Sequence, residues 1–357
     1  MFSKMNQWGL LFSRLWAAVC NRLPSAFWRT AQGSYWEWRL DDNDGRGKLV
    51  IFGVKPEGTK RVALLFNDRL LGHNEFDKDS FRFVIKRAKG RITPGAKFKI
   101  TSDDGVIPYL GKKLFWEVET PFVQQGGSRK LNIEKALSNG CLLTKKGTFR
   151  SPAFVQKRKK SYLAAYLAVK DWFDKMYGYP VLVSHGTLLG LVREGDLIPH
   201  DDDFDCLYLS TADSVESVCQ ERHNILCRLL ADGFECFVGS TGHIKVRYGK
   251  VEIDLMPSWI VDDSLNIAGF TVMPISDDEL RPFRLLPFAG GAVQAFARPE
   301  AFLEYQYGEG WRNPDPGYRS RPSADALRNR AKLRPRKEDV EQFGTASLRR
   351  EAEHRHA

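Results

Sequence analysis

Four aspartates lie within five residues of this chain, at Asp201, Asp202, Asp203 and Asp205. Repulsion between carboxylates this close spreads the segment apart or raises their pKa values unless a cation gathers them. Carboxylate oxygens are ligands that Mg²⁺ prefers, and Mg²⁺ commonly bridges them to a substrate phosphate. The cluster therefore predicts a site that holds a divalent metal, Mg²⁺ or Mn²⁺, together with a phosphate group.

The spacing of the aspartates divides them into two sets. Side chains two residues apart in a strand point to the same side, so Asp203 and Asp205 project together. Asp201 joins them only if the strand starts early, and an exposed acidic turn is the alternative for Asp201 and Asp202. A third carboxylate is available at Asp254, which lies between two apolar residues of a predicted neighbouring strand. We predict that Asp203, Asp205 and Asp254 are metal ligands and catalytic residues.

Other residues near the cluster are suited to binding a phosphate. Gly186 and Thr187 precede a predicted helix, where a small residue lets backbone N–H groups approach an anion. Arg193 lies on that helix, and Lys245 lies on a strand beside Asp254, so either could offset negative charge in a transition state. We predict these four as substrate-binding residues, with structural salt bridges as the alternative for the two cations.

The acidic residues need a set of elements that hold them in place. Apolar periodicity and turn signals predict a helix over 155–177, a strand over 180–184, a helix over 186–193, a strand over 204–209, a helix over 213–231 and strands over 244–248 and 251–255. Asp213 and Glu216 are expected to cap the third of these helices. A strand, a Gly-Thr turn, a helix and an acidic strand in this order are more specific than an isolated D-x-D pair.

Residues 34–150 have a different pattern. Short apolar runs at 48–54, 61–66, 81–86, 98–100 and 114–118 alternate with turn signals, which predicts a β-sandwich or small barrel. Trp36 and Trp38 could face a sugar, although core or edge packing is the expectation favoured by their surroundings. We predict a β-rich accessory domain that contributes no catalytic constellation.

Basic residues are concentrated in two stretches of the chain, and the N-terminal segment is amphipathic. The chain of 357 residues has a net charge of +10, with a basic run at 157–160 and a basic tail over 319–357. The first 30 residues have an apolar stripe that is too short to span a bilayer, so it predicts either an interfacial helix or a docked one. An anionic membrane or glycan would explain this charge as well as a nucleic acid, for which no aromatic RNA-binding signature is present, and a solvated basic tail is the alternative.

Cysteine usage favours a reducing compartment. None of the six cysteines forms a C-x-x-C pair, and no secretory signal is evident, so a disulfide framework is not expected. Cys219, His223 and Cys227 would share one face of a helix, but a zinc site needs a fourth ligand. We therefore predict buried apolar roles for the cysteines and a cytoplasmic protein, peripheral at the inner face of a membrane if the N-terminal segment binds there.

Several motifs in order resemble the signature of the LicD family. They are Ser184-His185-Gly186-Thr187-Leu188-Leu189-Gly190-Leu191-Val192-Arg193, Ile198-Pro199-His200-Asp201-Asp202-Asp203-Phe204-Asp205, Glu252-Ile253-Asp254-Leu255-Met256-Pro257, and Tyr305-Gln306-Tyr307-Gly308-Glu309-Gly310-Trp311 with Pro314. The resemblance covers about residues 154–318. His200 departs from it, because the family usually has tryptophan at that position.

The resemblance implies both a fold and an activity. It implies an α+β, nucleotidyltransferase-like (polymerase-beta-like) catalytic domain over 154–318, after the β-rich domain. Members of the family, which includes bacterial phosphocholine transferases and, more distantly, fukutin and fukutin-related protein, transfer a phospho-alcohol from a CDP-activated donor to a glycan. The expected partners are thus a CDP-linked donor and a glycan or lipid-linked glycan acceptor. Trp311 and Tyr307 would line the acceptor site, or pack in the core.

Three alternatives remain open at this point. The same carboxylates could serve nucleotidyl transfer to a small molecule or a D-x-D glycosyltransferase, both of which are also metal-dependent. A glycan-binding protein with an inactive catalytic domain is the alternative from another class. The acidic triad argues against it, because unused clustered carboxylates destabilise a fold. The sequence does not identify the alcohol or the acceptor.

Overall fold

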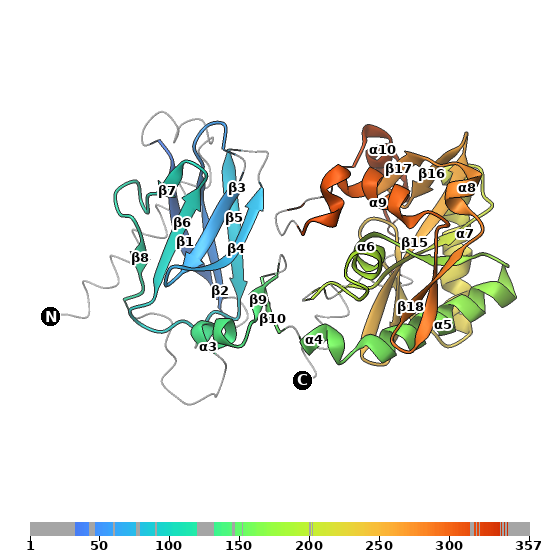
Figure 1. The fold of residues 1–357 in the computed structure, drawn as a ribbon, viewed down its shortest axis with the longest axis horizontal. Helices are drawn as coiled ribbons and strands as arrows, with labels where there is room; N and C mark the ends of the chain where they lie inside the picture. Colours follow the sequence, from blue (N-terminus) through green and yellow to red (C-terminus); the bar gives the residue numbers. More distant parts are fainter. Residues whose placement is uncertain are drawn as a thin grey trace. The chain divides into compact units, whose positions relative to one another are not determined.

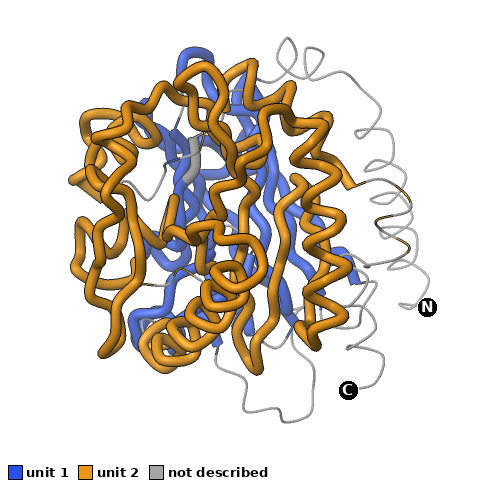
Figure 2. Tube along the Cα trace, turned by 90° about the vertical axis from the view of Figure 1, so that its right-hand side faces the viewer, with its two compact units in different colours: residues 1–151, 316–318 blue, residues 152–315, 319–357 orange. Residues whose placement is uncertain are grey.

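The computed structural model describes residues 33–42, 47–59, 61–75, 79–89, 91–119, 132–144, 147–151, 153–199, 201, 203–314, 318, 320, 322–335, 337, 339 and 341. The chain forms two compact units, residues 1–151 with 316–318 (unit 1) and residues 152–315 with 319–357 (unit 2), which are coloured separately in Figure 2. The predicted amphipathic segment 1–30, His200 and Asp202 lie outside the described residues.

Unit 1 is built from short antiparallel strands. Its elements are β1 (Tyr35–Asp41), β2 (Lys48–Val54), β3 (Arg61–Phe66), β4 (Arg69–Glu75), β5 (Ser80–Lys86), β6 (Lys97–Ser102), β7 (Gly105–Ile107), β8 (Trp116–Glu117), α3 (Ile133–Ser138), β9 (Leu142–Leu143) and β10 (Phe149–Arg150). One sheet has the order β1-β2-β5, and a second has the order β4-β3-β6-β7 with β8 paired to β6.

The two sheets of unit 1 enclose one apolar core, as expected for a sandwich. Ile51 and Ile85 from the first sheet and Leu64 and Ile100 from the second belong to the same buried cluster. Trp36 is completely buried in it. Trp38 stacks on Trp116 with ring centroids 4.3 Å apart. β3 buries alternate residues on the core side, whereas β2 also buries consecutive residues.

Unit 2 combines helices with a mixed sheet. Its elements are α4 (Ala153–Gln156), α5 (Lys159–Met176), β11 (Val181–Val183), α6 (His185–Arg193), β12 (Asp205–Leu209), α7 (Val215–Ala231), β13 (Glu235–Val238), β14 (Ile244–Tyr248), β15 (Val251–Val261), β16 (Ser264–Ile267), β17 (Thr271–Pro274), α8 (Asp277–Leu280), β18 (Arg284–Phe288), β19 (Gly291–Ala295), α9 (Pro299–Tyr307), η1 (Glu309–Arg312) and α10 (Ala324–Leu333). Its main sheet has the order β11-β12-β15-β14-β13, with β16 and β17 added beside β15.

Helices α5 and α7 cover one face of this sheet (Figure 1). Phe204 stacks on Tyr162 of α5, and Tyr208 stacks on Phe173 of the same helix. Cys236 on β13 donates from Sγ to the Leu226 carbonyl of α7 over 3.9 Å. Since strand residues alternate between faces, Asp205 and Leu207 must point to the opposite face. The apolar layer under the helices therefore directs the acidic residues to the other side of the sheet.

The structure differs from the sequence predictions at several element ends. The predicted helix over 155–177 is two helices, α4 and α5. Helix α7 begins after Ser214, whose side chain accepts from Ser217 N, rather than after Asp213. Ser214 has the extended backbone that a capping residue needs, so the cap predicted at Asp213 is wrong by one residue. The strand predicted over 204–209 begins at Asp205.

The beginning of the predicted basic tail is an ordered part of unit 2. Helix α10 is capped by Ser323 and buries Ala326 and Leu333. Leu333 packs with Val215, Val218 and Trp259. The sequence of this helix mixes Lys and Arg with alanines and two leucines, which gives only a weak apolar pattern. No helix in the described part of the chain combines the length and the apolar character needed to cross a membrane.

Candidate functional site

Three charged residues form a row across three neighbouring strands of unit 2. Asp205 on β12 is the Cα partner of Asp254 on β15 in a parallel pairing. Asp254 in turn is the partner of Lys245 on β14 in an antiparallel pairing. Residues paired in this way point to the same face of a sheet. The structure thus places the predicted third carboxylate directly beside Asp205, on the face that α5 and α7 leave free.

Helix α6 begins directly above Asp205. The backbone N–H of Gly186 donates to Asp205 Oδ2 over 3.1 Å. The Asp205 N–H donates to the Thr187 hydroxyl over 2.7 Å, and Thr187 is buried. These two hydrogen bonds fix the helix to the strand, so the carboxylate occupies the N-terminal position where an anion is stabilised. Gly186 therefore already faces an anion, whereas the Thr187 hydroxyl has a structural partner.

Asp205 is in an environment that opposes its charge. Burial raises its pKa well above the usual range, and the neighbouring Asp201, Asp254 and Asp203 raise it further. The hydrogen bond from Gly186 acts in the other direction but does not compensate. A buried carboxylate beside three others needs either a proton or a cation. A raised pKa with these causes is typical of a carboxylate that binds a cation.

Asp201 lies closer to the site than the strand argument suggested. A Cβ atom placed on Gly186 would be 2.9 Å from Asp201 Oδ2 and 3.2 Å from Asp205 Oδ2. The Asp203 N–H donates weakly to Asp201 Oδ1 over 3.4 Å, so the segment turns instead of running straight into β12. Turning brings Asp201 toward Gly186 without the early strand start that the sequence argument required.

Basic residues partly balance the row. Lys245 Nζ forms an ion pair with Asp254 Oδ1 and lies 3.2 Å from Glu252 Oε1. Burial acts to lower the pKa of Lys245, but Asp254 and Glu252 outweigh it and the pKa is raised. Arg247 lies farther along β14 and pairs with Glu235 and Glu252. Lys245 is therefore a fixed positive charge in the row, whichever substrate the site takes.

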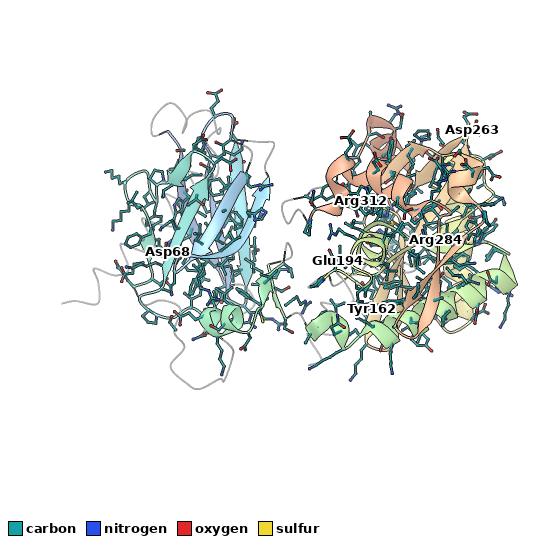
Figure 3. The ribbon with its side chains drawn as sticks, viewed as in Figure 1. Asp68, Tyr162, Glu194, Asp263, Arg284 and Arg312 are labelled. Atoms are coloured by element: carbon teal, nitrogen blue, oxygen red, sulfur yellow. The ribbon has the colours of Figure 1, made fainter. Side chains whose placement is uncertain are left out.

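Arg193 and Trp311 contact each other. Arg193 donates from Nη1 to the Trp311 carbonyl over 3.3 Å and from Nε to Glu194 over 2.7 Å. The Trp311 ring is buried in the core of unit 2, and Arg312 lies over it. Figure 3 labels Glu194 and Arg312, their chain neighbours, on the same side of unit 2. The structure thus joins α6 to η1 here, and substrate contacts for Arg193 and Trp311 stay predictions.

His185 is a residue of the site that the sequence analysis did not single out. It starts α6 with φ of 41°, a left-handed conformation that is strained for a side chain other than glycine or asparagine. Its ring meets Phe270 and Phe302 edge-on, at centroid distances of 5.7 Å and 5.6 Å. Backbone strain beside Gly186 is a signal of function that a sequence does not contain.

The environment of His185 predicts a pH-dependent stability. Burial lowers the pKa of His185 from 6.5 to about 4. Below pH 6.5 the unfolded chain therefore binds a proton at His185 that the folded chain does not bind. The free energy of unfolding falls as the pH decreases from 6.5 to about 4. The loss is at most about 3 kcal/mol, and partial exposure of the ring reduces it to about 1–2 kcal/mol.

Denaturant unfolding of wild type and His185→Asn between pH 4 and 7 measures this effect. Asparagine tolerates the left-handed backbone and does not titrate. We expect the difference in unfolding free energy between the two proteins to change in favour of the variant as the pH falls. A difference that is independent of pH would show that the imidazole is as easily protonated in the folded protein as in the unfolded one.

The donor set is of the kind that hard cations prefer. Asp201, Asp203, Asp205 and Asp254 supply oxygen ligands from two adjacent strands and the turn before one of them. Within the described ranges, no three His, Cys, Asp or Glu side chains already stand at distances that would hold an ion. The carboxylates thus lie close enough to affect the pKa of Asp205, but their side chains would have to rotate to enclose a cation.

The possible zinc ligands have other contacts. His223 Nδ1 lies 3.1 Å from Asp339 Oδ1, and Cys227 Sγ lies 3.7 Å from His223 Nε2. Cys219 donates from Sγ to the Lys332 carbonyl. These contacts tie α7 to the chain around and after α10, which gives the three residues a packing role.

Part of unit 2 matches a known family model. Residues 178–297 match the model described as LicD/FKTN/FKRP, nucleotidyltransferase domain. This segment is similar to that family. The match confirms the resemblance drawn from the motifs, and it includes Gly186, Asp205 and Asp254. It ends before η1, so Trp311 and α10 lie beyond the LicD match. Among curated proteins, none matches the chain.

Solved structures give a weaker likeness. A solution structure of the antibiotic-resistance factor ANT(2'')-Ia is 16% identical, with coverage of 57% of this chain and 100% of that chain and a TM-score of 0.30. A crystal structure of ANT(2'')-Ia in complex with adenylyl-2''-tobramycin is 16% identical, with coverage of 54% and 97% and a TM-score of 0.28. Overlaps this low have no bearing on the activity of unit 2. The mixed helix and strand content predicted for the chain is confirmed.

Proposed function

We propose that unit 2 is a metal-dependent phosphotransferase that moves a phospho-alcohol, such as phosphocholine or ribitol phosphate, from a CDP-activated donor to a glycan or lipid-linked glycan. The observation that carries the proposal is the register of the sheet. It sets Asp205 beside Asp254 under the first turn of α6, within the segment that matches the LicD model. Clustered carboxylates next to a helix N-terminus suit a substrate that combines a diphosphate with a divalent cation.

The carboxylates have distinct tasks in this proposal. Asp203 and Asp205 would hold Mg²⁺ or Mn²⁺, and Asp254 would either complete that set or accept the proton of the acceptor hydroxyl. When bound, the metal neutralises the donor diphosphate and polarises its phosphorus. Lys245 stays close to Asp254 and offsets negative charge that develops during transfer. Gly186 keeps the approach to the helix N-terminus free of a side chain.

The bond changes follow from this arrangement. The acceptor hydroxyl oxygen forms a bond to the phosphorus that carries the alcohol, and the bond from that phosphorus to the bridging oxygen breaks. CMP leaves, and the hydroxyl proton passes to a base. Catalysis of this kind depends on positioning and charge stabilisation more than on covalent steps, which fits a site composed of carboxylates, a lysine and backbone N–H groups.

Nucleotidyl transfer is the second candidate. The matched family is described as a nucleotidyltransferase domain, and the same carboxylates would serve. The two reactions differ in the phosphorus that is attacked and therefore in the leaving group. A phospho-alcohol transfer releases CMP, whereas nucleotidyl transfer from a triphosphate releases pyrophosphate. A peripheral contact with an anionic membrane, where lipid-linked acceptors reside, belongs to the first candidate.

A donor panel tests the proposal. The purified full chain is incubated with CDP-choline, CDP-ribitol, CDP-glycerol, UDP-sugars and nucleoside triphosphates, and consumption of each is followed chromatographically. We expect a CDP-linked alcohol to be consumed, the consumption to stop with EDTA, and Mg²⁺ or Mn²⁺ to restore it. Metal-independent consumption would contradict the role of the carboxylates, and use of a triphosphate alone would favour the second candidate.

A further inference from the structure

His243 is a buried histidine that faces the acidic row. Its Nε2 lies 3.5 Å from Asp254 Oδ2 and has no closer hydrogen-bond partner among the described residues. Its Nδ1 lies 2.7 Å from the hydroxyl of Thr241. If that hydroxyl donates to Nδ1, the proton of a neutral ring is on Nε2 and points at Asp254. Burial lowers the pKa of His243, although Asp254 opposes this effect.

The turn before His243 is shaped to hold the ring. His243 follows a turn in which the Gly239 N–H donates to the His243 carbonyl over 2.7 Å. A Cβ atom on Gly239 would lie 2.1 Å from Cε1 and 2.2 Å from Nε2 of His243. The imidazole therefore packs directly on the Gly239 backbone. Any side chain at this position would displace the ring from Asp254.

Helix α10 and Arg222 support the same turn. Arg222 is buried on α7 and donates from Nη1 to the carbonyls of Gly242 and Leu333, over 3.1 Å and 2.6 Å. A Cβ atom on Gly242 would lie 2.3 Å from the Leu333 carbonyl oxygen, so the end of α10 touches the turn. Asp339 holds the other arm of the Arg222 guanidinium. The backbone next to His243 is thus fixed by Arg222 together with Leu333 and Asp339, which lie beyond the LicD match.

A second contact of α10 reaches the other side of the site. Arg330 donates from Nε to the Gly269 carbonyl over 3.0 Å, and its guanidinium lies 5.5 Å from the centre of the Phe270 ring. Phe270 meets both histidines of the site, His185 at 5.7 Å and His243 at 6.0 Å between ring centroids. One helix therefore supports the turns that hold both rings beside the carboxylates.

We infer that His243 is a positioning residue that donates from Nε2 to Asp254, and that Arg222 and α10 hold it in place. The inference deepens the proposed function, on which it rests, by assigning the support of the third carboxylate. His243 faces Oδ2 of Asp254 and Lys245 pairs with Oδ1, so the two side chains together set the orientation of this carboxylate. Outer residues of this kind change metal affinity by about 10–100-fold.

Binding of Mn²⁺, measured by electron paramagnetic resonance on the purified full chain, tests the inference separately from turnover. His243→Ala and Gly239→Ala are each expected to weaken Mn²⁺ binding about tenfold or more, and His243→Gln, which keeps an N–H donor, is expected to restore part of it. His73→Gln in unit 1 is the matched control and is expected to bind Mn²⁺ as wild type does. Thermal melting shows whether each variant is folded.

The support that Arg222 gives to the turn before His243 is tested with a second pair of variants. Arg222→Gln is expected to weaken Mn²⁺ binding several-fold, whereas Arg228→Gln, on the exposed side of the same helix, is expected to leave it unchanged. Wild-type affinity in folded His243→Ala would overturn the inference. If wild type binds Mn²⁺ with the predicted dependence on His243 but consumes no CDP-linked donor, the proposed function fails and the positioning role stands.

Discussion

Asp205→Asn is expected to abolish transfer and, at neutral pH without metal, to make the protein more stable. Loss of a metal-binding carboxylate removes several kcal/mol of transition-state stabilisation, which corresponds to at least about a hundredfold in turnover. The stability effect has a separate cause. The wild-type carboxylate is buried beside Asp201, Asp254 and Asp203, and its pKa is raised well above the usual range. A neutral amide avoids that repulsion.

The sign of the stability effect depends on pH. A carboxyl group whose pKa is raised in the folded state does not destabilise the protein below its unfolded pKa of about 4. The stability of the protein falls as the pH rises from that value to the folded pKa. In EDTA, the melting temperature of Asp205→Asn should therefore exceed that of wild type increasingly from about pH 4 upward. Added Mn²⁺ should raise the melting temperature of wild type more than that of the variant.

Asp196→Asn provides a control of opposite sign. Burial acts to raise the pKa of Asp196, but Lys159, Gln156 and the Leu197 N–H outweigh it, so the pKa is lowered. This carboxylate contributes stability above its unfolded pKa, so Asp196→Asn should lower the melting temperature at neutral pH. If both variants were destabilised alike in EDTA, Asp205 would be an ordinary structural carboxylate and the metal assignment would lose its physical basis.

Gly186→Ala is expected to reduce turnover by about a hundredfold while the protein stays folded. The added Cβ would lie 2.9 Å from Asp201 Oδ2 and 3.2 Å from Asp205 Oδ2, so at least one carboxylate must move. Misplacement of a reacting group by about 1 Å is enough for an effect of this size. The measurement is kcat and KM for the donor identified by the panel, together with a melting curve.

Gly72→Ala is the matched control for this substitution. Gly72 lies on β4 of unit 1, and a Cβ atom there would meet nothing within 4 Å. The control should keep wild-type kinetics. Unchanged kinetics in Gly186→Ala would mean that the start of α6 does not form part of the site, because a methyl group at this point cannot avoid the carboxylates.

The sequence was most informative where one face of a strand is buried. The strands predicted over 48–54, 61–66 and 244–248 agree with β2, β3 and β14. β3 and β14 alternate between more and less buried residues, and β2 is a short apolar run with consecutive buried residues. Strands β1 and β4 were not predicted. β1 does alternate apolar and charged residues, so its period was present in the sequence and was overlooked. β4 contains Gly72 and His73 and has no clear apolar period.

The candidate site was likewise predicted only in part. Strand alternation was used to group Asp203 with Asp205, but β12 begins at Asp205, so Asp203 lies before the strand. The apolar flanks of Asp254 indicated a neighbouring strand, which the register with Asp205 bears out. The position of Asp201 could not be predicted, because it follows from a turn and not from a repeating element. Whether these residues bind a metal stays a prediction.

His185 and His243 were missed for a related reason. Each is a single histidine, and its role follows from the folded structure. His185 has a left-handed backbone, and the ring of His243 packs on the backbone of Gly239. Helix α10 was not predicted as a packed element, because only Ala326 and Leu333 of it are buried and its other contacts involve backbone carbonyls and one arginine. Composition alone described this helix as a basic tail.

The most direct test of the account is to identify the nucleotide released when the purified full chain consumes a CDP-linked alcohol in the presence of Mg²⁺ and a glycan acceptor. The account predicts CMP, one per phospho-alcohol transferred, and no CMP from Asp205→Asn. Release of pyrophosphate from a triphosphate, or of a nucleoside diphosphate from a sugar donor, with no CMP from any CDP-linked alcohol, would contradict it.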